Sequence, residues 1–165
     1  MNGWRCAYVG LGSNLAEPAQ QVLTAFDELA ALTDSRLDTR SALFRSAPMG
    51  PPEQPAYINA AARLLTALEP AALLEGLQAI ERAHGRDRSG PRWGPRTLDL
   101  DLLLYENLSL ATATLILPHP GLTARNFVVY PLAQIAPGLV LPGGEPLADL
   151  RARLGHEGLE QLEGT

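Results

Sequence analysis

The sequence predicts a single α+β domain over residues 1–165, with an antiparallel sheet in ferredoxin-like βαββαβ order, helices packed on it and a short C-terminal extension. Two observations lead to this prediction. Apolar runs typical of strands alternate with stretches of helical spacing in that order. The connections between them are short, and neither a repeat nor an interdomain linker interrupts the chain.

The first half of the chain supplies three of these elements. Residues 4–11 form an apolar run that predicts a buried strand, ended by residues 12–14. Pro18 suits a first helical turn, and apolar residues recur after it at helical spacing. The weak alternation of residues 36–45 predicts a second strand.

The second half predicts a strand and a helix, then a loop rich in arginine, and then another strand. Residues 57–68 predict a long strand, and Pro70 opens a helix with an apolar stripe. Gly85 stands where a helix C-terminal glycine belongs. After the loop, residues 98–105 predict a strand that carries two aspartates. The C-terminal part adds a short strand at residues 115–117 and short helices at 127–135 and 147–154.

Composition is typical of a soluble globular protein. Hydrophobic residues make up 46% of the chain and its net charge is −5, which disfavours nucleic acid and anionic membranes as partners. No apolar run approaches the roughly 20 residues of a transmembrane helix, and no signal segment begins the chain. Cys6, the single cysteine, is expected in the core. We expect a cytoplasmic monomer.

Arginines gather in one loop of this acidic chain. All 13 basic residues are arginine, and five of them fall within residues 82–96. A composition bias explains the missing lysines but not the cluster. Because a guanidinium presents a planar fork to phosphate oxygens, the cluster indicates a small anionic ligand. Residues 10–14 complete neither a dinucleotide-binding motif nor a P-loop and favour a strand-end turn, so the arginine loop is the main candidate for phosphate binding.

Asp99 and Asp101 follow that loop on one face of the predicted strand, because side chains alternate along a strand. Leu98, Leu100 and Leu102 then face the apolar layer. Paired carboxylates repel each other unless a hard divalent cation neutralises them. A solvent-facing edge strand would produce the same pattern, but the neighbouring arginine loop favours a metal and phosphate site.

Five other side chains have both a functional and a structural interpretation. Glu81 could support a metal or a ribose, or be a solvated helix residue. His119, held between two prolines, could donate to phosphate or be an ordinary turn residue. Tyr57, Asn59 and Phe127 could form a pocket for a flat heterocycle, whereas pattern alone places the aromatic residues in the core.

Four segments resemble the 6-hydroxymethyl-7,8-dihydropterin pyrophosphokinases of folate biosynthesis. They are residues 8–15 (YVGLGSNL), 54–61 (QPAYINAA), 92–101 (RWGPRTLDLD) and 117–120 (LPHP). The third segment is the most specific, because so long an ungapped match is rare by chance. The resemblance implies a ferredoxin-like α+β domain that transfers the β,γ-diphosphate of ATP to the pterin hydroxymethyl group, releases AMP and uses two magnesium ions.

The resemblance also implies a role for each matching position. Asp99 and Asp101 would bind the magnesium ions and, with Arg86 and Arg96, form the catalytic set. ATP would also contact Glu81, Arg88, His119, Arg125 and the backbone of Leu102. The pterin would stack between Tyr57 and Phe127. Its other contacts would be Ser46, Ala47, Met49, Asn59 and Trp93.

Two positions depart from the family pattern. Thr114 stands where well-known members have an arginine, and Pro120 stands where an aromatic residue is common. Both belong to the family's nucleotide-binding surface, so a difference is expected in ATP affinity, while the metal and pterin residues are intact. An inactive nucleotide-binding domain and a metal-dependent phosphohydrolase are the alternative functions of such a site.

Overall fold

The structure is a computed structural model that describes residues 3–47, 55–85 and 97–163. The described strands are β1 (Arg5–Ser13), β2 (Ser35–Arg40), β3 (Phe44–Ser46), β4 (Tyr57–Thr66), β5 (Asp99–Tyr105), β6 (Leu110–Ala111), β7 (Ile116–Leu117) and β8 (Leu159–Gln161). The helices are α1 (Pro18–Ala30), α2 (Pro70–Ala83), the 3-10 helix η1 (Leu122–Ala124), α3 (Asn126–Ile135) and α4 (Leu147–Leu154). Within the described ranges, no helix has both the length and the apolar character needed to cross a membrane.

The expected antiparallel sheet is present. Its strands are ordered β5-β1-β4-β3-β8, and β2 also pairs with β4. Every pair in this sheet is antiparallel. β1 and β4 pair from Arg5 opposite Thr66 to Ser13 opposite Ile58. This register brings the end of β1 beside the starts of β4 and β5.

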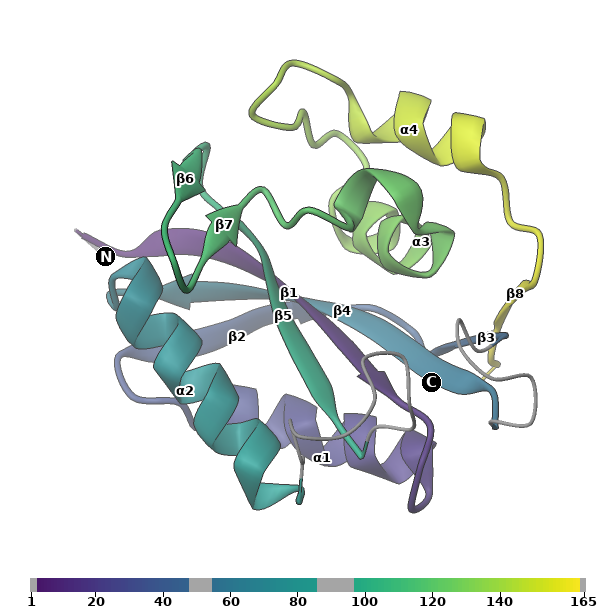
Figure 1. Ribbon diagram of the computed structural model, residues 1–165, viewed down its shortest axis with the longest axis horizontal. Coiled ribbons are helices and arrows are strands. Elements are labelled where there is room, and N and C mark those ends of the chain that lie inside the picture. Colours follow the sequence, from purple (N-terminus) through teal and green to yellow (C-terminus); the bar gives the residue numbers. More distant parts are fainter. Residues whose placement is uncertain (1–2, 48–54, 86–96, 164–165) are drawn as a thin grey trace.

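Helices cover both faces of the sheet, with α1 and α2 on one side and α3 and α4 on the other (Figure 1). Phe26 of α1 and Leu77 of α2 belong to the buried cluster on the first face. Val129 of α3 and Leu150 of α4 belong to a second cluster on the opposite face. The C-terminal part is therefore a layer of the core rather than an appendage.

The two long helices begin where the sequence predicts, and α2 also ends there. Pro18 and Pro70 stand in the first turns of α1 and α2, where a missing N–H has no intrahelical partner to lose. α2 ends at Ala83, and Gly85 follows with a φ of 80°. Glycine adopts this left-handed conformation without steric cost.

Three local predictions were wrong. The strand predicted over residues 36–45 is two strands, because Ser41 bonds Ala61 through both its backbone N–H and its hydroxyl and interrupts the ladder. Gly10 and Gly12 do not form a turn, since β1 continues through both. Cys6 is half-buried rather than in the core, and burial raises the pKa of its thiol above the ordinary value.

Candidate active site

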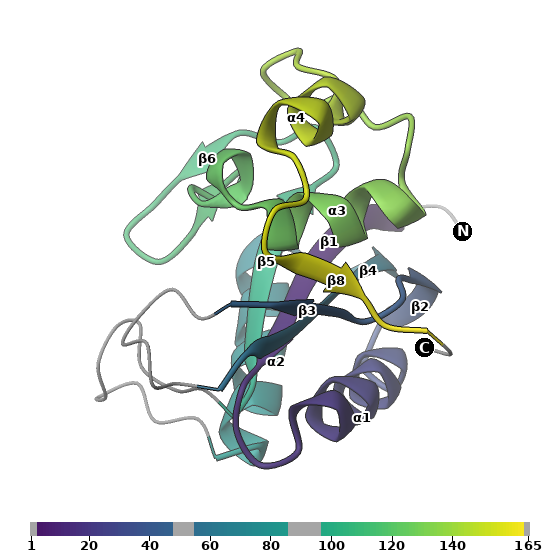
Figure 2. The same cartoon turned by 90° about the vertical axis from the view of Figure 1, so that its right-hand side faces the viewer.

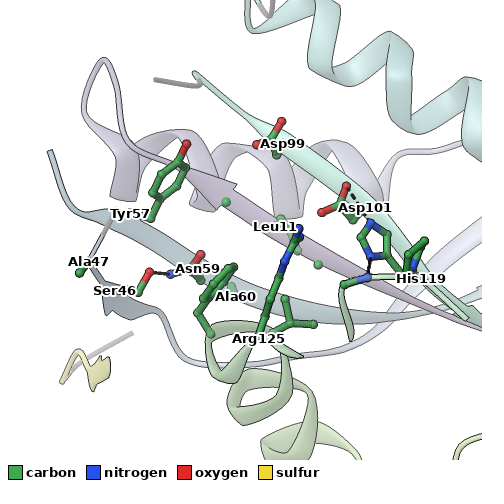
Figure 3. Close-up of a pocket in the computed structure, with 16 residues that line it drawn as sticks. Leu11, Ser46, Ala47, Tyr57, Asn59, Ala60, Asp99, Asp101, His119 and Arg125 are labelled. Carbon is green, nitrogen blue, oxygen red and sulfur yellow. Dashed lines mark hydrogen bonds and ion pairs between the residues drawn. The ribbon is translucent and has the colours of Figure 1, made fainter. Parts of the chain in front are cut away.

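A cavity of about 400 Å³ opens beside the N-terminus of α3, between that helix and the sheet (Figure 3). Nine of the residues around it are ones that the sequence predicts to bind metal, nucleotide or pterin. The complete lining is Gly10, Leu11, Gly12, Ser46, Ala47, Tyr57, Asn59, Ala60, Asp99, Asp101, His119, Pro120, Gly121, Arg125, Phe127 and Val128.

Three neighbouring strands arrange the polar groups of the cavity in rows. Gly12 of β1 lies opposite Asn59 of β4 on one side and opposite Asp99 of β5 on the other. Gly10 likewise lies opposite Asp101. Directly opposed residues share a face of the sheet, and adjacent strands are about 4.8 Å apart. Asn59 and Asp99 are therefore separated by about 10 Å, with a glycine that has no side chain between them.

Replacing Gly12 with valine should block this space without unfolding the protein. A Cβ at Gly12 would lie 3.5 Å from Asn59 Oδ1 and 3.9 Å from Tyr57 Cδ1, so the backbone tolerates it, and valine suits a strand. Its two methyl groups would occupy the cavity floor. We expect pterin affinity, measured by calorimetry, to fall by about tenfold or more.

The control for that variant is Gly138→Val, since Gly138 has no atom within 4 Å of its Cβ position and does not line the cavity. The control should leave pterin affinity unchanged. Equal affinities of Gly12→Val and the parent chain would show that the space above Gly12 is not used by the ligand.

Asp99 and Asp101 suit a hard divalent cation. Both point from β5 toward the cavity (Figure 3), and the side chain of Asp101 is 43% exposed. Among the described residues no three His, Cys, Asp or Glu side chains converge on a possible metal position. Mg²⁺ is usually held by one or two carboxylates together with substrate phosphates and water, so the pair is sufficient without a third protein ligand.

His119 lies beside the aspartates with its orientation set by the backbone. Its backbone N–H donates to Leu103 O at 3.0 Å, and Gly121 N donates to its Nδ1 at 3.0 Å. In a neutral imidazole an accepting Nδ1 leaves the proton on Nε2. Nε2 is 3.8 Å from Asp101 Oδ1, so this N–H faces the proposed metal and phosphate region.

Arg125 reaches the cavity from the residue that precedes α3. Its guanidinium lies against Gly121, where a Cβ would come within 2.6 Å of the Arg125 Cζ. The same Cζ is 6.0 Å from the centroid of the Phe127 ring. Because residue 121 has no side chain, there is room for the positively charged Arg125 guanidinium close to His119.

The opposite end of the cavity has the features of a pocket for a flat, hydrogen-bonding ring. Asn59 is 4% exposed, and its side-chain amide donates to Ser46 Oγ at 2.8 Å. Asn59 Oδ1 faces Gly12, at 3.5 Å from the Cβ position there. Tyr57 and Ala47 lie at this end with Asn59 and Ser46 (Figure 3), and Phe127 also lines the cavity. The structure thus brings together the described residues predicted for the pterin.

Glu81 and Leu102 do not line the cavity. Glu81 is 2% exposed, so its interpretation as a solvated helix residue was wrong. Its carboxylate accepts a hydrogen bond from Leu100 N at 2.8 Å and ties α2 to β5 beside the aspartates. The side chain of Leu102 is in the core. Their predicted contacts with ATP stay predictions.

Removing the Glu81 carboxylate should destabilise the protein. In Glu81→Ala the buried N–H of Leu100 loses its acceptor, which costs about 1–3 kcal/mol of unfolding free energy in urea titration. Glu81→Gln keeps an acceptor oxygen and should lose less. Glu75→Ala, on the exposed side of the same helix, is the control, and an equal loss in this control would contradict a special role for Glu81.

Two buried polar residues that the sequence analysis did not single out lie next to the cavity. Ser13 and Asn14 are 0% and 1% exposed. The Ser13 hydroxyl donates to Thr97 O, and Asn14 Nδ2 donates to Pro55 O at 3.1 Å. The end of β1 therefore holds the chain just before β4 and just before β5. The predicted site residues Met49, Arg86, Arg88, Trp93 and Arg96 lie outside the described residues.

Comparison with known proteins agrees with this geometry. The pattern that defines 7,8-dihydro-6-hydroxymethylpterin-pyrophosphokinase (HPPK) matches residues 8–137. The chain belongs to this family. The match includes every residue that lines the cavity, from Gly10 to Val128.

Curated relatives extend the similarity to nearly the whole chain. A 2-amino-4-hydroxy-6-hydroxymethyldihydropteridine pyrophosphokinase from Pseudomonas aeruginosa is 50% identical over 158 residues, which cover 96% of this chain and 97% of the relative. A protein of the same name from Haemophilus influenzae is 44% identical over 144 residues, or 87% of this chain and 89% of the relative.

Solved HPPK-DHPS structures share the fold. One, in complex with substrates, superposes with a TM-score of 0.75 at 12% identity and covers 98% of this chain. The triple-mutant Plasmodium falciparum HPPK-DHPS with pteroate also superposes with a TM-score of 0.75, at 11% identity, and covers 96% of this chain. This chain spans about half of those two chains, 47% and 46% respectively. At such identities the likeness concerns the HPPK fold alone.

The two departures from the family pattern occupy different places. Pro120 lines the cavity next to His119. Thr114 is exposed in the turn between β6 and β7 and is not part of the lining. Of the two, Pro120 is thus the one placed to change the shape of the cavity directly.

Proposed function

We propose that this chain transfers the diphosphate of ATP to 6-hydroxymethyl-7,8-dihydropterin in folate biosynthesis, yielding AMP and the pterin diphosphate. One observation carries this function: paired carboxylates and an aromatic and amide pocket open into one cavity, two strands apart, with Gly12 between them. Membership of the HPPK family supports the same reaction. So do three curated relatives that are 43% to 50% identical and carry the pyrophosphokinase name.

The reaction joins the two substrates directly. The pterin hydroxyl oxygen forms a bond to the β-phosphorus of ATP, and the bond from that phosphorus to the α,β-bridging oxygen breaks. AMP leaves with the bridging oxygen, and the hydroxyl proton passes to water. Such a transfer needs positioning and charge neutralisation more than covalent participation of the protein. A cavity that receives both substrates supplies the positioning.

Asp99 and Asp101 are our proposed ligands for two Mg²⁺ ions. When bound, the metal would neutralise phosphate charge and polarise phosphoryl oxygens. The two carboxylates face the cavity from one strand, and the Glu81 bond to Leu100 N fixes the residue between them. The protein thereby holds its two negative charges at a set spacing before any ligand binds.

The remaining roles follow from chemistry and position. His119 Nε2–H and Arg125 would donate to phosphate oxygens of ATP, since both line the cavity and His119 lies beside Asp101. Tyr57 and Phe127 would stack on the pterin, and Asn59 would hydrogen-bond to its edge. We further propose that Arg86 and Arg96, outside the described residues, add permanent positive charge at the transferring group, where one arginine in other phosphoryl-transfer enzymes contributes about 10³–10⁵ in rate.

A product assay tests this function. Purified protein, Mg²⁺, ATP and 6-hydroxymethyl-7,8-dihydropterin should produce AMP and pterin diphosphate in equal amounts. ADP in place of AMP would identify a different kinase and contradict diphosphate transfer. ATP hydrolysis in the absence of pterin would favour a metal-dependent phosphohydrolase, and binding without turnover would favour an inactive nucleotide-binding domain.

We also propose that the core follows the ferredoxin-like plan. The order β5-β1-β4-β2, with α1 after β1 and α2 after β4, supports this assignment. In that plan both helices between strands cover one face of the sheet. The other face is then left for α3, α4 and the cavity.

A further inference from the structure

The pterin end of the cavity has two walls on separate elements. Ser46 and Ala47 form one wall at the end of β3, and Phe127 forms the other in the first turn of α3. A ring that stacks on Phe127 and meets Ser46 and Ala47 at its edge contacts both walls, so it fits only if their spacing is held. Their relative position therefore matters for the pterin, and the question is which contacts maintain it.

The C-terminal strap, defined as residues 155–161, runs from the end of α4 to the edge of the sheet and contacts both walls. Figure 2 shows it descending past α3 and ending in β8 beside β3. β8 pairs with β3 so that Ser46 lies opposite Leu159 and Arg45 lies opposite Glu160. Arg45 Nη1 and Glu160 Oε1 are 2.8 Å apart across this pair. β3 is thus held from its outer side by the strap.

Asn126 connects the strap to the helical wall. Its side-chain Nδ2 donates to Gly155 O and to Glu157 O, both at 3.0 Å. Asn126 is the first residue of α3 and stands between Arg125 and Phe127, which both line the cavity. One amide group therefore uses both of its hydrogens to hold the strap at the point where α3 enters the site.

We propose that Asn126 is a positioning residue for the pterin: through the strap, it sets the spacing between the Phe127 wall and the β3 wall. This inference rests on the proposed function for the identity of the ligand. The nucleotide side has its own support, because Arg125 packs against Gly121 and His119 is bonded to the backbone. Loss of the Asn126 bonds should consequently affect the pterin more than ATP.

The test compares Asn126→Asp with Gln134→Ala in the full-length protein. The aspartate substitution keeps the shape of the asparagine side chain but removes both donors, so the two carbonyl oxygens of the strap lose their bonds. Gln134 is a matched control on the same helix, since its Oε1 accepts a hydrogen bond from Ala42 N at 2.6 Å and the residue does not line the cavity. Asn126→Ser is the milder second variant. Dissociation constants are measured by calorimetry for 6-hydroxymethylpterin and for the non-transferable analogue α,β-methylene-ATP.

In Asn126→Asp the pterin dissociation constant should rise by about five- to tenfold, with less than about a twofold change for the ATP analogue. Gln134→Ala should change neither. Equal weakening of both ligands, or no change in either, would overturn the positioning role. Parent protein that neither binds the pterin nor forms pterin diphosphate would overturn the proposed function and this inference together.

Hydrogen exchange in the unliganded protein tests the strap without reference to any ligand. Backbone amides of residues 156–161 should exchange several-fold faster in Asn126→Asp and in Asn126→Ser than in Gln134→Ala. Unchanged exchange would show that Asn126 does not hold the strap, even if the parent chain forms AMP and pterin diphosphate. Failure of the Asn126 inference is thereby distinguished from failure of the proposed function.

Discussion

Asn substitutions at Asp99 and Asp101, made one at a time, should each reduce AMP formation by about 10³-fold or more. Asparagine keeps the size of the side chain but removes the negative charge that a hard cation requires. Both side chains face the cavity from β5. Neither is at the pterin end, so pterin affinity should persist. Activity is measured by following labelled ATP, and metal binding by the paramagnetic signal of Mn²⁺.

Asp149→Asn is the control for this pair, because Asp149 is exposed on α4 and does not line the cavity. It should leave both AMP formation and Mn²⁺ binding unchanged. A variant at Asp99 or Asp101 that keeps a tenth of the parent activity and binds Mn²⁺ normally would exclude that residue as a metal ligand.

Phe127→Ala should weaken pterin binding by about 10- to 100-fold. Stacking of a heterocycle on an aromatic side chain contributes about 1–3 kcal/mol, and each 1.4 kcal/mol corresponds to about a tenfold change in affinity. Phe127 lines the cavity and is only partly buried, so its removal should cost little stability. Fluorescence quenching of the pterin measures the effect, and binding of the ATP analogue should be retained.

Phe127→Tyr and Phe127→Leu separate stacking from simple apolar contact. Tyrosine keeps the ring and should bind the pterin about as well as the parent protein does. Leucine keeps apolar volume without a ring and should resemble alanine. If the Phe127→Leu variant binds the pterin as tightly as the parent protein does, the contact is simply hydrophobic and the stacking role is wrong.

The period of two along a strand predicts the two faces of β5 correctly. Leu98, Leu100 and Leu102 are buried on the α1 and α2 side, as expected, and Asp99 and Asp101 face the cavity. This success has a local cause, because the alternation of side chains depends only on the strand conformation. Composition alone misled at Gly10 and Gly12, because glycines favour a turn locally but are held in β1 here by pairing with β4 and β5.

The family resemblance predicts the residues that meet in the cavity, although pattern alone assigns Tyr57 and Phe127 to the core. Amphipathic spacing distinguishes an apolar face from a polar one, but it cannot tell a packed face from the wall of a cavity. For Glu81 the error is the opposite, because a residue interpreted as solvated is buried. A glutamate on a helix is usually solvated, whereas this one is buried because β5 presents a backbone N–H to it.

The order of β1, α1, β4, α2 and β5, the starts of α1 and α2, the aspartate face of β5 and the family are all contained in the sequence, because each depends on local periodicity or on a run of specific residues. The short strands β6 and β8 were not predicted. Three features required the folded chain. They are the alignment of Asn59, Gly12 and Asp99 across three strands, the second core layer of α3 and α4, and the Asn126 contacts with the strap. Each depends on register or packing between segments far apart in the chain, which no local pattern encodes.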